Sequence, residues 1–446
     1  MRHLRTLVLD NASALENPEF ANLTALTTIC ITFPWNLLDL ATLLRLPRLA
    51  HLTTFAPYES HQPSAGTASI VLPSYIKSLT FAVASPPFDT IILPSASAFV
   101  ALEELLITNG SGLTDLPNHI DYLLPSLRKL TFRKCSSLVH LPENFASLSR
   151  LETLIFYDCG LLTLPDSFGD LPALKLLVLE FVPLWGLPPS FCDLTSLEAL
   201  FLAGCDELRQ LPAGFSRLTA LKALCITECV FPLPDDVGAL LTYCEQLSSL
   251  PAGLPPSLET LCLGPFREGS SHEVDIGHLT QLRVLKLTRV GVCCGPAVSG
   301  RVLCLQELEQ LEMRVKGDIR ELPVTLALVR LPRLRSLLIQ APGICSLPEN
   351  MAAALPDLQQ LELLSWSPEE LPECIWELSS LMSLKINAPQ LLALLQGMSC
   401  LSRLRKLELI RCKALQHLPD FLTQLHRLSL RSTLLSSVPE EFVLLD

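Results

Sequence analysis

One apolar pattern recurs along the whole chain and constrains its fold more than any other feature. Its clearest copy covers residues 151–171 and reads LETLIFYDCGLLTLPDSFGDL. Apolar residues occupy the first, fourth and sixth positions, a cysteine occupies the ninth, and a Leu-Pro pair follows. Leu154 and Phe156 alternate with their neighbours, which is the two-residue period of a β-strand. Phe168 and Leu171 lie three residues apart, which suits a helical turn. One copy therefore predicts a short strand, a turn and a short helix or 3-10 segment.

Copies of this unit follow one another along the sequence. Aligning the first apolar position finds 18 copies, most of them 21 to 27 residues apart. These first positions are Leu4, Leu26, Leu49, Ile76, Leu102, Leu127, Leu151, Leu174, Leu197, Leu221, Leu258, Leu282, Leu308, Leu334, Leu358, Leu381, Leu404 and Leu425. A unit of this size cannot bury its own apolar edge and must stack on its neighbours. The period therefore predicts an elongated solenoid with a parallel sheet.

This period falls in the window of roughly 20–29 residues that is typical of leucine-rich repeats. The sequence resembles the leucine-rich repeat superfamily over nearly all of its 446 residues. The resemblance implies an α/β horseshoe with a concave parallel sheet and short helices or 3-10 turns on the convex side. We predict one solenoid over residues 1–446 with about 18 or 19 repeats.

The regularity of the repeats varies along the chain. We predict looser repeats in residues 1–101, regular repeats in 102–236, an irregular insert in 237–300 and regular repeats again in 301–446. A compressed nineteenth unit is predicted to begin near Val237, because 240–251 resembles 200–212 with one residue missing. The first strand has nothing before it and the last unit is incomplete, so we expect a covering partner or a longer chain.

Leu-Pro pairs predict the convex layer. Proline lacks an N–H and has a fixed φ, so it suits the first turn of a short helix. A large apolar residue follows three positions after the proline in many units, and these residues are Ile120, Phe145, Phe168, Phe191, Phe215, Met351 and Ile375. Stacked on one another, they are expected to form a second apolar spine beneath the convex side.

The composition points to a cytoplasmic protein. Apolar residues make up 49% of the chain, but no uncharged apolar run approaches the roughly 20 residues of a membrane span. The N-terminus already reads as a repeat strand, so we expect no signal peptide. The chain has 16 cysteines and no CxxC pair, which fits a reducing compartment. Five of the cysteines recur at the ninth repeat position and are predicted to be small buried residues: Cys135, Cys159, Cys205, Cys229 and Cys412.

The sequence carries no recognisable catalytic motif. It contains no GxxxxGK[ST] phosphate loop, no HExxH, no GxSxG and no kinase signature. We therefore expect no enzyme activity, no cofactor and no bound metal. The alternative is that the chain is the regulatory or sensor part of a larger enzyme or nucleotide-binding switch whose catalytic domain lies outside this sequence.

Outward strand positions suggest a partner-binding surface on the concave face. In the middle of the chain these positions are apolar or aromatic, and the candidate residues are Ile155, Tyr157, Val178, Phe181 and Phe201. Clustered exposed aromatic residues tend to mark protein interfaces. The alternative is that strands simply tolerate apolar residues at outward positions.

Further along the chain the outward positions become basic. The candidate residues are Arg283, Lys286, Arg289, Lys385, Arg405, Lys406 and Arg411. The whole chain carries a net charge of −12, which disfavours nucleic acid as a partner. The basic positions would instead suit an acidic segment of another protein. The alternative is that a basic residue beside the first leucine is a habit of such repeats.

The unit LxxLxLxxCxxLxxLPxxFxxLxx resembles two intracellular groups of leucine-rich repeat proteins. One is the cytoplasmic repeat region of plant nucleotide-binding disease-resistance proteins, and the other is the Ras-group type. The first resemblance implies recognition in defence, and the second implies a scaffold in signal transduction. Both imply a non-catalytic module that binds protein. The partner, the pathway and the oligomeric state do not follow from the sequence.

Overall fold

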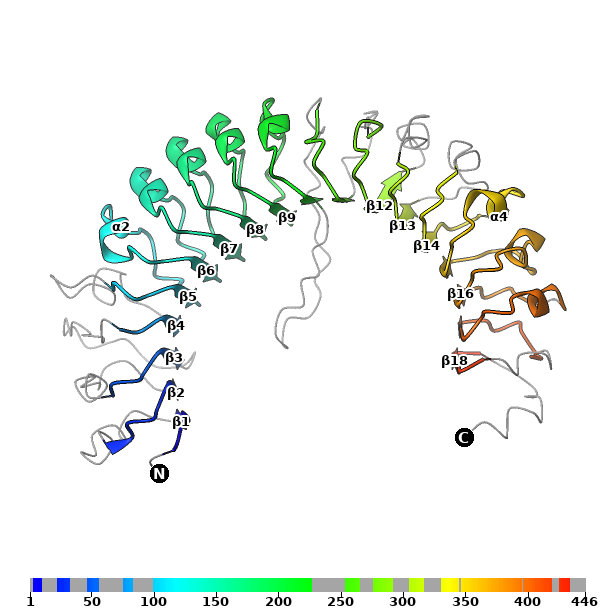
Figure 1. The fold of residues 1–446 in the computed structure, drawn as a ribbon, viewed down its shortest axis with the longest axis horizontal. Coiled ribbons are helices and arrows are strands. Elements are labelled where there is room, and N and C mark those ends of the chain that lie inside the picture. The colour runs from blue at the N-terminus through cyan, green and yellow to red at the C-terminus, as the bar shows by residue number, and fades with distance from the viewer. Residues whose placement is uncertain are drawn as a thin grey trace. The chain divides into compact units, whose positions relative to one another are not determined.

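A computed structural model describes residues 3–9, 22–32, 46–55, 75–82, 99–226, 253–264, 276–291, 305–316, 330–344, 346–394, 396–418 and 425–433. Short parallel strands alternate with short helical turns, which confirms the predicted α/β leucine-rich repeat fold (Figure 1). The described residues fall into two compact units, the first ending at Leu221 and the second beginning at Lys222. The prediction that the whole chain forms one solenoid stays a prediction.

Each of the 18 aligned repeats contains one strand in the described residues. The strands of the first unit are β1 (Thr6–Leu9), β2 (Thr28–Thr32), β3 (His51–Phe55), β4 (Ser78–Ala82), β5 (Glu104–Thr108), β6 (Lys129–Arg133), β7 (Thr153–Tyr157), β8 (Leu176–Glu180) and β9 (Ala199–Ala203). Those of the second unit are β10 (Ala223–Ile226), β11 (Thr260–Leu263), β12 (Val284–Gly291), β13 (Gln310–Lys316), β14 (Ser336–Gln340), β15 (Gln360–Leu364), β16 (Ser383–Asn387), β17 (Lys406–Ile410) and β18 (Arg427–Arg431). Within each unit successive strands pair in parallel and keep the repeat positions in register, for example Leu154 beside Leu177 and Leu177 beside Leu200.

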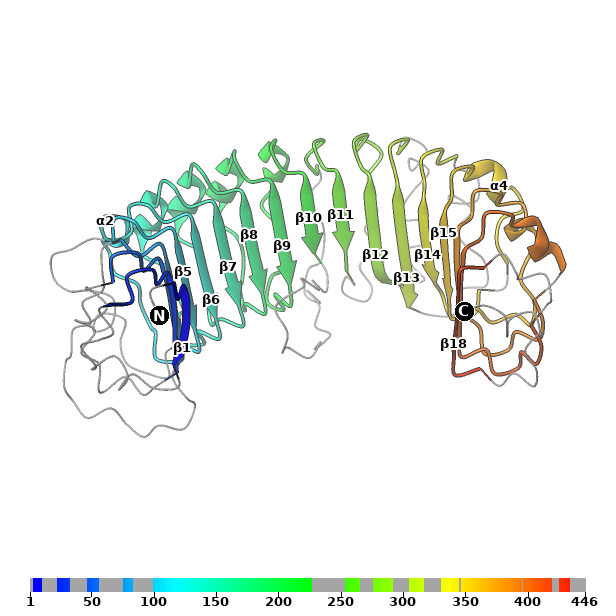
Figure 2. The ribbon, with the colours of Figure 1, turned by 60° about the horizontal axis from the view of Figure 1, so that its bottom comes forward.

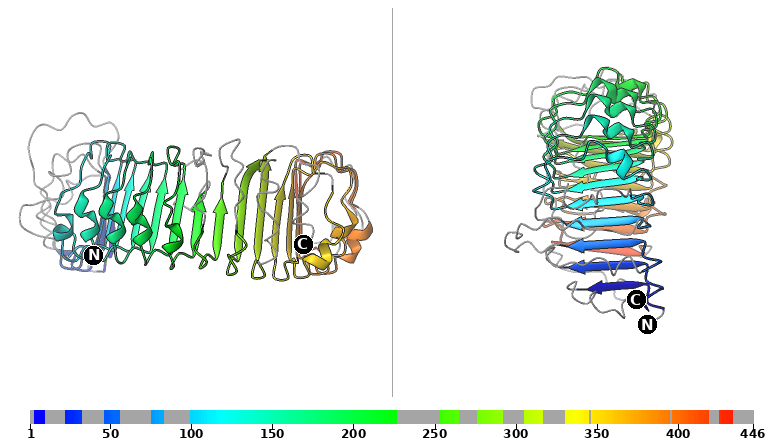
Figure 3. Two further views of the ribbon diagram at one scale, coloured as in Figure 1. Left: turned by 90° about the horizontal axis from the view of Figure 1, so that it is seen from above. Right: turned by 90° about the vertical axis from the view of Figure 1, so that its left-hand side faces the viewer.

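Short helical turns lie on the opposite side of each unit from the strands (Figures 1 and 3). They are α2 (Ile120–Leu123), η5 (Glu143–Ser147), η6 (Asp166–Asp170), η7 (Pro189–Asp193), η8 (Phe215–Arg217), α4 (Met351–Ala354), η11 (Glu373–Ile375) and η12 (Gln396–Cys400). Pro142, Pro165 and Pro188 immediately precede the turns η5, η6 and η7, with φ near −65°. The prolines therefore stand one residue before the helical turn, where their fixed φ sets the direction of the chain.

Two apolar layers form the core between the strands and the turns. Repeat positions four and six are completely buried on β7, β8 and β9, where they hold Leu154, Phe156, Leu177, Leu179, Leu200 and Leu202. The second spine is also present. The rings of Phe145, Phe168, Phe191 and Phe215 stack with successive centroid distances of 6.4, 6.2 and 6.5 Å and nearly parallel planes. These four repeats are therefore held to one another by both layers.

The cysteines at position nine connect successive repeats. Cys135, Cys159, Cys205 and Cys412 are buried, as predicted, and Cys229 lies outside the described residues. The thiol of Cys159 donates to the carbonyl of Phe132 at 3.5 Å, and that of Cys205 donates to the carbonyl of Leu179 at 3.4 Å. Both carbonyls belong to position six of the preceding repeat. A small buried donor at this turn thus satisfies a backbone acceptor near the end of the neighbouring strand.

Position eight turns the chain away from the sheet with a left-handed backbone. Asn109, Lys134, Asp158, Phe181 and Arg411 share φ values of 54–56°. Their N–H groups continue the ladder: for example, Phe181 donates to the carbonyl of Ala203 at 2.8 Å. Only asparagine and aspartate adopt this region readily among such side chains. The hydrogen bond to the next repeat therefore holds the bulkier residues in it.

Some of the predicted irregularities fall where the structure describes little. Of the insert predicted at 237–300, the described residues 253–264 and 276–291 contain β11 and β12. The compressed unit near Val237 lies outside the described residues. Among those that are described, no helix is long and apolar enough to cross a membrane.

The repeat register can be tested at Leu200. Its side chain is completely buried at position four of β9, so Leu200→Asp would bury an unpaired carboxylate at a cost of several kcal/mol. We expect a clear loss of thermal stability in a melting curve followed by circular dichroism. The exposed Thr195→Asp variant introduces the same charge nearby and should melt like the wild type. Wild-type stability of Leu200→Asp would show that the register is wrong.

The contact between neighbouring turns can be tested at Gly169. A Cβ atom there would overlap the carbonyl oxygen of Ser190, because η6 and η7 touch through their backbones. Gly169→Ala should therefore lower the free energy of unfolding by about 1–3 kcal/mol. Gly186 has nothing within 4 Å of the added atom, so Gly186→Ala should be neutral or slightly stabilising. Denaturant unfolding of both variants compares them, and equal stability would contradict the close packing of the turns.

Candidate binding face on the concave strands

The strands of the first unit present an outward face built from repeat positions three, five and seven. These positions alternate with the buried positions four and six, so their side chains point away from the core. Figure 2 shows β5 to β9 lying side by side. In register across these strands, position five holds Leu106, Thr131, Ile155, Val178 and Phe201, and position seven holds Thr108, Arg133, Tyr157, Glu180 and Ala203.

A depression of about 270 Å³ lies on this face over β4 to β8. We call it the strand-face depression. Ile155, Leu176 and Val178 supply apolar wall, while charged and aromatic side chains come from the third and seventh positions: Glu104, Lys129, Arg133, Tyr157 and Glu180. The depression therefore combines an apolar wall with groups of both charges.

The predicted apolar residues lie together, but they differ in exposure. Ile155, Val178 and Phe201 are direct neighbours on β7, β8 and β9. Ile155 and Phe201 are half-buried, whereas Val178 exposes 3% of its surface and Tyr157 exposes 7%. Val178 and Tyr157 are therefore largely covered by their neighbours. Of the predicted apolar residues, Ile155, Phe201 and Phe181 are therefore the ones that remain partly accessible.

Tyr157 is held in place from two sides. The guanidinium carbon of Arg133 lies 5.2 Å from the centre of the tyrosine ring, a cation–π arrangement. The ring of Phe181 meets Tyr157 edge-on, with centroids 5.3 Å apart. Burial and the nearby Glu180 carboxylate raise the pKa of the Tyr157 hydroxyl. The tyrosine is therefore a fixed, neutral side chain between a cation and an aromatic edge.

Glu180 is the most unusual residue of the depression. It stands beside Tyr157 in the position-seven row and exposes 2% of its surface. Its Oε1 atom accepts no hydrogen bond from the residues that the structure describes. Burial raises the pKa of its carboxyl group to about 7, and the positive charge of Arg133 only partly opposes this effect. A buried acceptor without a donor is costly, so it calls for an explanation.

Sequence reasoning missed Arg133 and Glu180 as site residues, because the prediction of an apolar centre rested on the position-five row. The position-seven row reads Arg133, Tyr157, Glu180 on three successive strands, which places a cation, an aromatic ring and an anion side by side. This order is visible in the sequence once the register is known, but the burial of Glu180 is not.

The basic residues predicted in the second unit are largely paired with carboxylates of the same face. Lys286 and Arg314 both contact Glu312, at 3.5 and 2.6 Å. Lys385 contacts Glu362 at 2.9 Å and Lys406 contacts Glu408 at 2.8 Å, while Arg283 pairs with Glu309. A hydrogen bond from Lys406 lowers the pKa of Glu408, and one from Arg283 lowers that of Glu309. This pairing offsets much of the positive charge.

The other predicted basic residues lie at strand ends. Arg405, just before β17, donates to the carbonyls of Ser402 and Leu404 at 3.4 Å. Arg411, just after β17, is exposed and adopts the left-handed backbone of position eight. Arg289 lies in β12, and its side chain is outside the described residues. Of the predicted basic residues, Arg405 and Arg411 therefore form no ion pair with a carboxylate in the described part of this unit.

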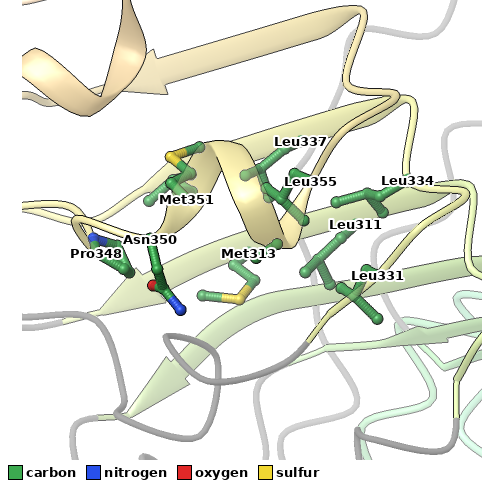
Figure 4. A pocket seen from close by; sticks show the side chains of 11 residues that line it. Leu311, Met313, Leu331, Leu334, Leu337, Pro348, Asn350, Met351 and Leu355 are labelled. Carbon is green, nitrogen blue, oxygen red and sulfur yellow. The ribbon is translucent and has the colours of Figure 1, made fainter. Parts of the chain in front are cut away.

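A small apolar cavity in the second unit lies between helix α4 and strands β13 and β14 (Figure 4). Its volume is about 40 Å³, and its lining is aliphatic or thioether apart from Pro348 and Asn350. Met351 and Leu355 line it from the helix side, and Met313 and Leu337 line it from the strands. A void of this size and polarity is part of core packing. In the described residues, no group of three or more His, Cys, Asp or Glu side chains could hold a metal ion.

Solved structures share this fold at low sequence identity. A leucine-rich repeat protein of Leptospira interrogans is 21% identical over 99% of this chain and 97% of that chain, with a TM-score of 0.58. The TLR13–ssRNA13 complex gives 21% identity, 99% and 60% coverage and a TM-score of 0.60. The Toll–Spätzle complex of Drosophila gives 15% identity, 97% and 55% coverage and a TM-score of 0.55. This chain thus spans little more than half of the last two proteins.

No protein-family model matches the sequence, and no curated protein matches it. The likeness to the solved structures shows that the chain has the leucine-rich repeat fold.

The burial of Glu180 can be tested through the pH dependence of stability. An unfolded glutamate has a pKa near 4.5, whereas that of Glu180 is about 7 in the folded protein. Between these two pKa values the carboxyl group is protonated in the folded state and ionised in the unfolded state. The free energy of unfolding therefore falls as the pH rises from about 4.5 to about 7. Relative to Glu180→Gln, the free energy of unfolding of the wild type should fall by on the order of 2 kcal/mol between pH 5 and pH 8. This value is reduced for solvent screening.

Denaturant unfolding at several pH values measures this difference. Glu207→Gln removes an exposed carboxylate of the same unit and serves as the control, since its stability difference from the wild type should stay nearly constant. If the Glu180→Gln difference also stays constant with pH, the carboxyl group is not desolvated.

Proposed function

We propose that this chain is a non-catalytic module that binds another protein through the concave strand face of its first unit. The observation that carries the proposal is the strand-face depression over β4 to β8. The half-buried Ile155 lies there beside a fixed aromatic residue and charged groups. The half-buried Phe201 adjoins the depression on β9, next to Val178. Protein interfaces are enriched in aromatic residues and arginine around an apolar centre with a polar rim.

A protein partner suits this face better than a nucleic acid does. Two of the similar structures are complexes, one with RNA and one with Spätzle. Nucleic-acid binding depends on neutralising many phosphates with Lys and Arg. This chain has a net charge of −12, and the first-unit face mixes Glu104 and Glu180 with Lys129 and Arg133.

The proposal extends to cytoplasmic signal transduction or defence recognition. Resemblance of the repeat unit to disease-resistance and Ras-group proteins supports this context. The cysteines that the structure describes form no disulfide with one another. The alternative is a sensor region within a larger enzyme or nucleotide-binding switch, which would use the same face to hold its neighbouring module.

For the second unit we propose a separate contact with an acidic protein segment. Arg405 and Arg411 at the edges of β17 support it, because neither is paired with a carboxylate in the described residues. Rim charges of this kind mainly set the association rate and its salt dependence.

Truncating the accessible apolar residues tests the first-unit face. Ile155→Ala combined with Phe201→Ala removes apolar contact area without emptying the core, and it should weaken partner binding at least about tenfold, mostly through faster dissociation. Tyr122→Ala is the matched control, since Tyr122 is 65% exposed on α2 at the convex side. A partner isolated by affinity purification is then measured by surface plasmon resonance. Unchanged kinetics in the double variant with loss of binding in Tyr122→Ala would place the interface on the convex side.

A further inference from the structure

The strand-face depression holds a buried carboxylate whose donor is missing, and this points to the chemistry of its occupant. Glu180 exposes 2% of its surface and lines the depression. Its Oε1 atom finds no donor among the described residues. Native proteins rarely leave such an atom without a partner unless a ligand supplies one.

Neither of the two cations that line the depression forms an ion pair with Glu180 in the described residues. The guanidinium of Arg133 lies over the ring of Tyr157, and no ion pair joins Arg133 to Glu180 in the described part of the chain. Lys129 is exposed on β6 and lies directly opposite Glu104 on β5. Arg133 therefore opposes the effect of burial on Glu180 only in part, which leaves Oε1 as the acceptor for a positive group from outside.

The shape of the depression fits one long amphipathic side chain. Ile155, Leu176 and Val178 form apolar wall, and the carboxylate is the buried charged group among them. Lysine and arginine lay their methylene stems along apolar surface and place the charge at the tip. A volume of about 270 Å³ is below the roughly 300–1,000 Å³ that is typical of small-molecule pockets, but it can accept a single side chain.

We propose that the strand-face depression is a socket for one lysine or arginine side chain of the protein partner, with Glu180 as the counter-ion. This inference rests on the proposed protein-binding function of the same face and names the residue type that it recognises. The buried ion pair would add specificity, because a neutral or acidic side chain would leave Glu180 unsatisfied.

The proposal requires a defined pH dependence. The charged or titratable groups that line the depression are Glu104, Lys129, Arg133, Tyr157 and Glu180. A cation pairs with the ionised form of Glu180, and with a pKa of about 7 its ionised fraction increases about tenfold between pH 6 and pH 8. Affinity should therefore rise by up to about tenfold over this interval.

A peptide selection tests the socket directly, because it needs no purified partner. The full chain is immobilised at pH 8, and a phage library of random twelve-residue peptides is selected on it. Enriched peptides are synthesised, and their affinities are measured by isothermal titration calorimetry at pH 6 and pH 8. We expect a shared Lys or Arg whose replacement by norleucine weakens binding at least about tenfold.

Variants of the chain separate the contributions. Glu180→Gln should weaken the same peptides at least about tenfold, abolish the rise of affinity with pH, and make the norleucine replacement nearly neutral. Glu207→Gln removes an exposed carboxylate of the same unit outside the depression and should change affinity little. Thermal melting of each variant confirms that it is folded.

The outcomes distinguish this inference from the proposed function. If the peptides lose affinity for the Ile155→Ala and Phe201→Ala double variant but not for Glu180→Gln, the socket proposal is wrong and the proposed binding face is still supported. Acidic or neutral peptides that bind better at pH 6 and need Glu180 would show that it acts as a neutral hydrogen-bond donor, and would also overturn the proposal. Peptides indifferent to all these variants, or no enrichment over a blank surface, would count against both.

Discussion

The structure depends on the burial of apolar edges between successive repeats, because no single repeat can bury its own. Leu154 and Phe156 on β7 are covered by Leu177 and Leu179, which occupy the same repeat positions on the neighbouring strand β8. The stacked rings of Phe168 and Phe191 do the same beneath the convex turns. Burial of this kind is non-directional and follows area. The repeat period must therefore bring like positions together, whatever residues stand between them.

Directional contacts then refine the register that burial sets. The backbone at Gly169 is so close to Ser190 that a Cβ does not fit, and the thiol of Cys159 reaches the carbonyl of Phe132 in the preceding repeat. Phe181 accepts a left-handed backbone, which suits it poorly, because its N–H completes a hydrogen bond to Ala203. Each of these contacts joins two neighbouring repeats. The regular spacing of the repeats and the unusual residues at these positions therefore both follow from the packing of one repeat on the next.

The concave face is free of these constraints, since outward positions need only avoid disrupting the strands. In the first unit these outward positions hold a cation, an aromatic ring and a buried carboxylate in one row: Arg133, Tyr157 and Glu180. In the second unit they hold oppositely charged side chains that form ion pairs, such as Lys286 with Glu312. A buried unpartnered carboxylate costs stability, whereas the paired charges cost little. The first-unit face therefore carries the stronger argument for recognition.

The sequence by itself determined the fold and the repeat register, because hydrophobic period, Leu-Pro spacing and position-nine cysteines are all properties of the order of residues. It also placed Ile155, Val178 and Phe201 on one face. Only the tertiary structure decided which of these residues are accessible, that Glu180 is buried without a donor, and that most basic residues of the second unit are paired. Exposure, desolvation and charge pairs such as Lys385 with Glu362 depend on distances between residues more than twenty positions apart. Residue order sets which positions meet, but side-chain packing across neighbouring strands sets how closely they do so.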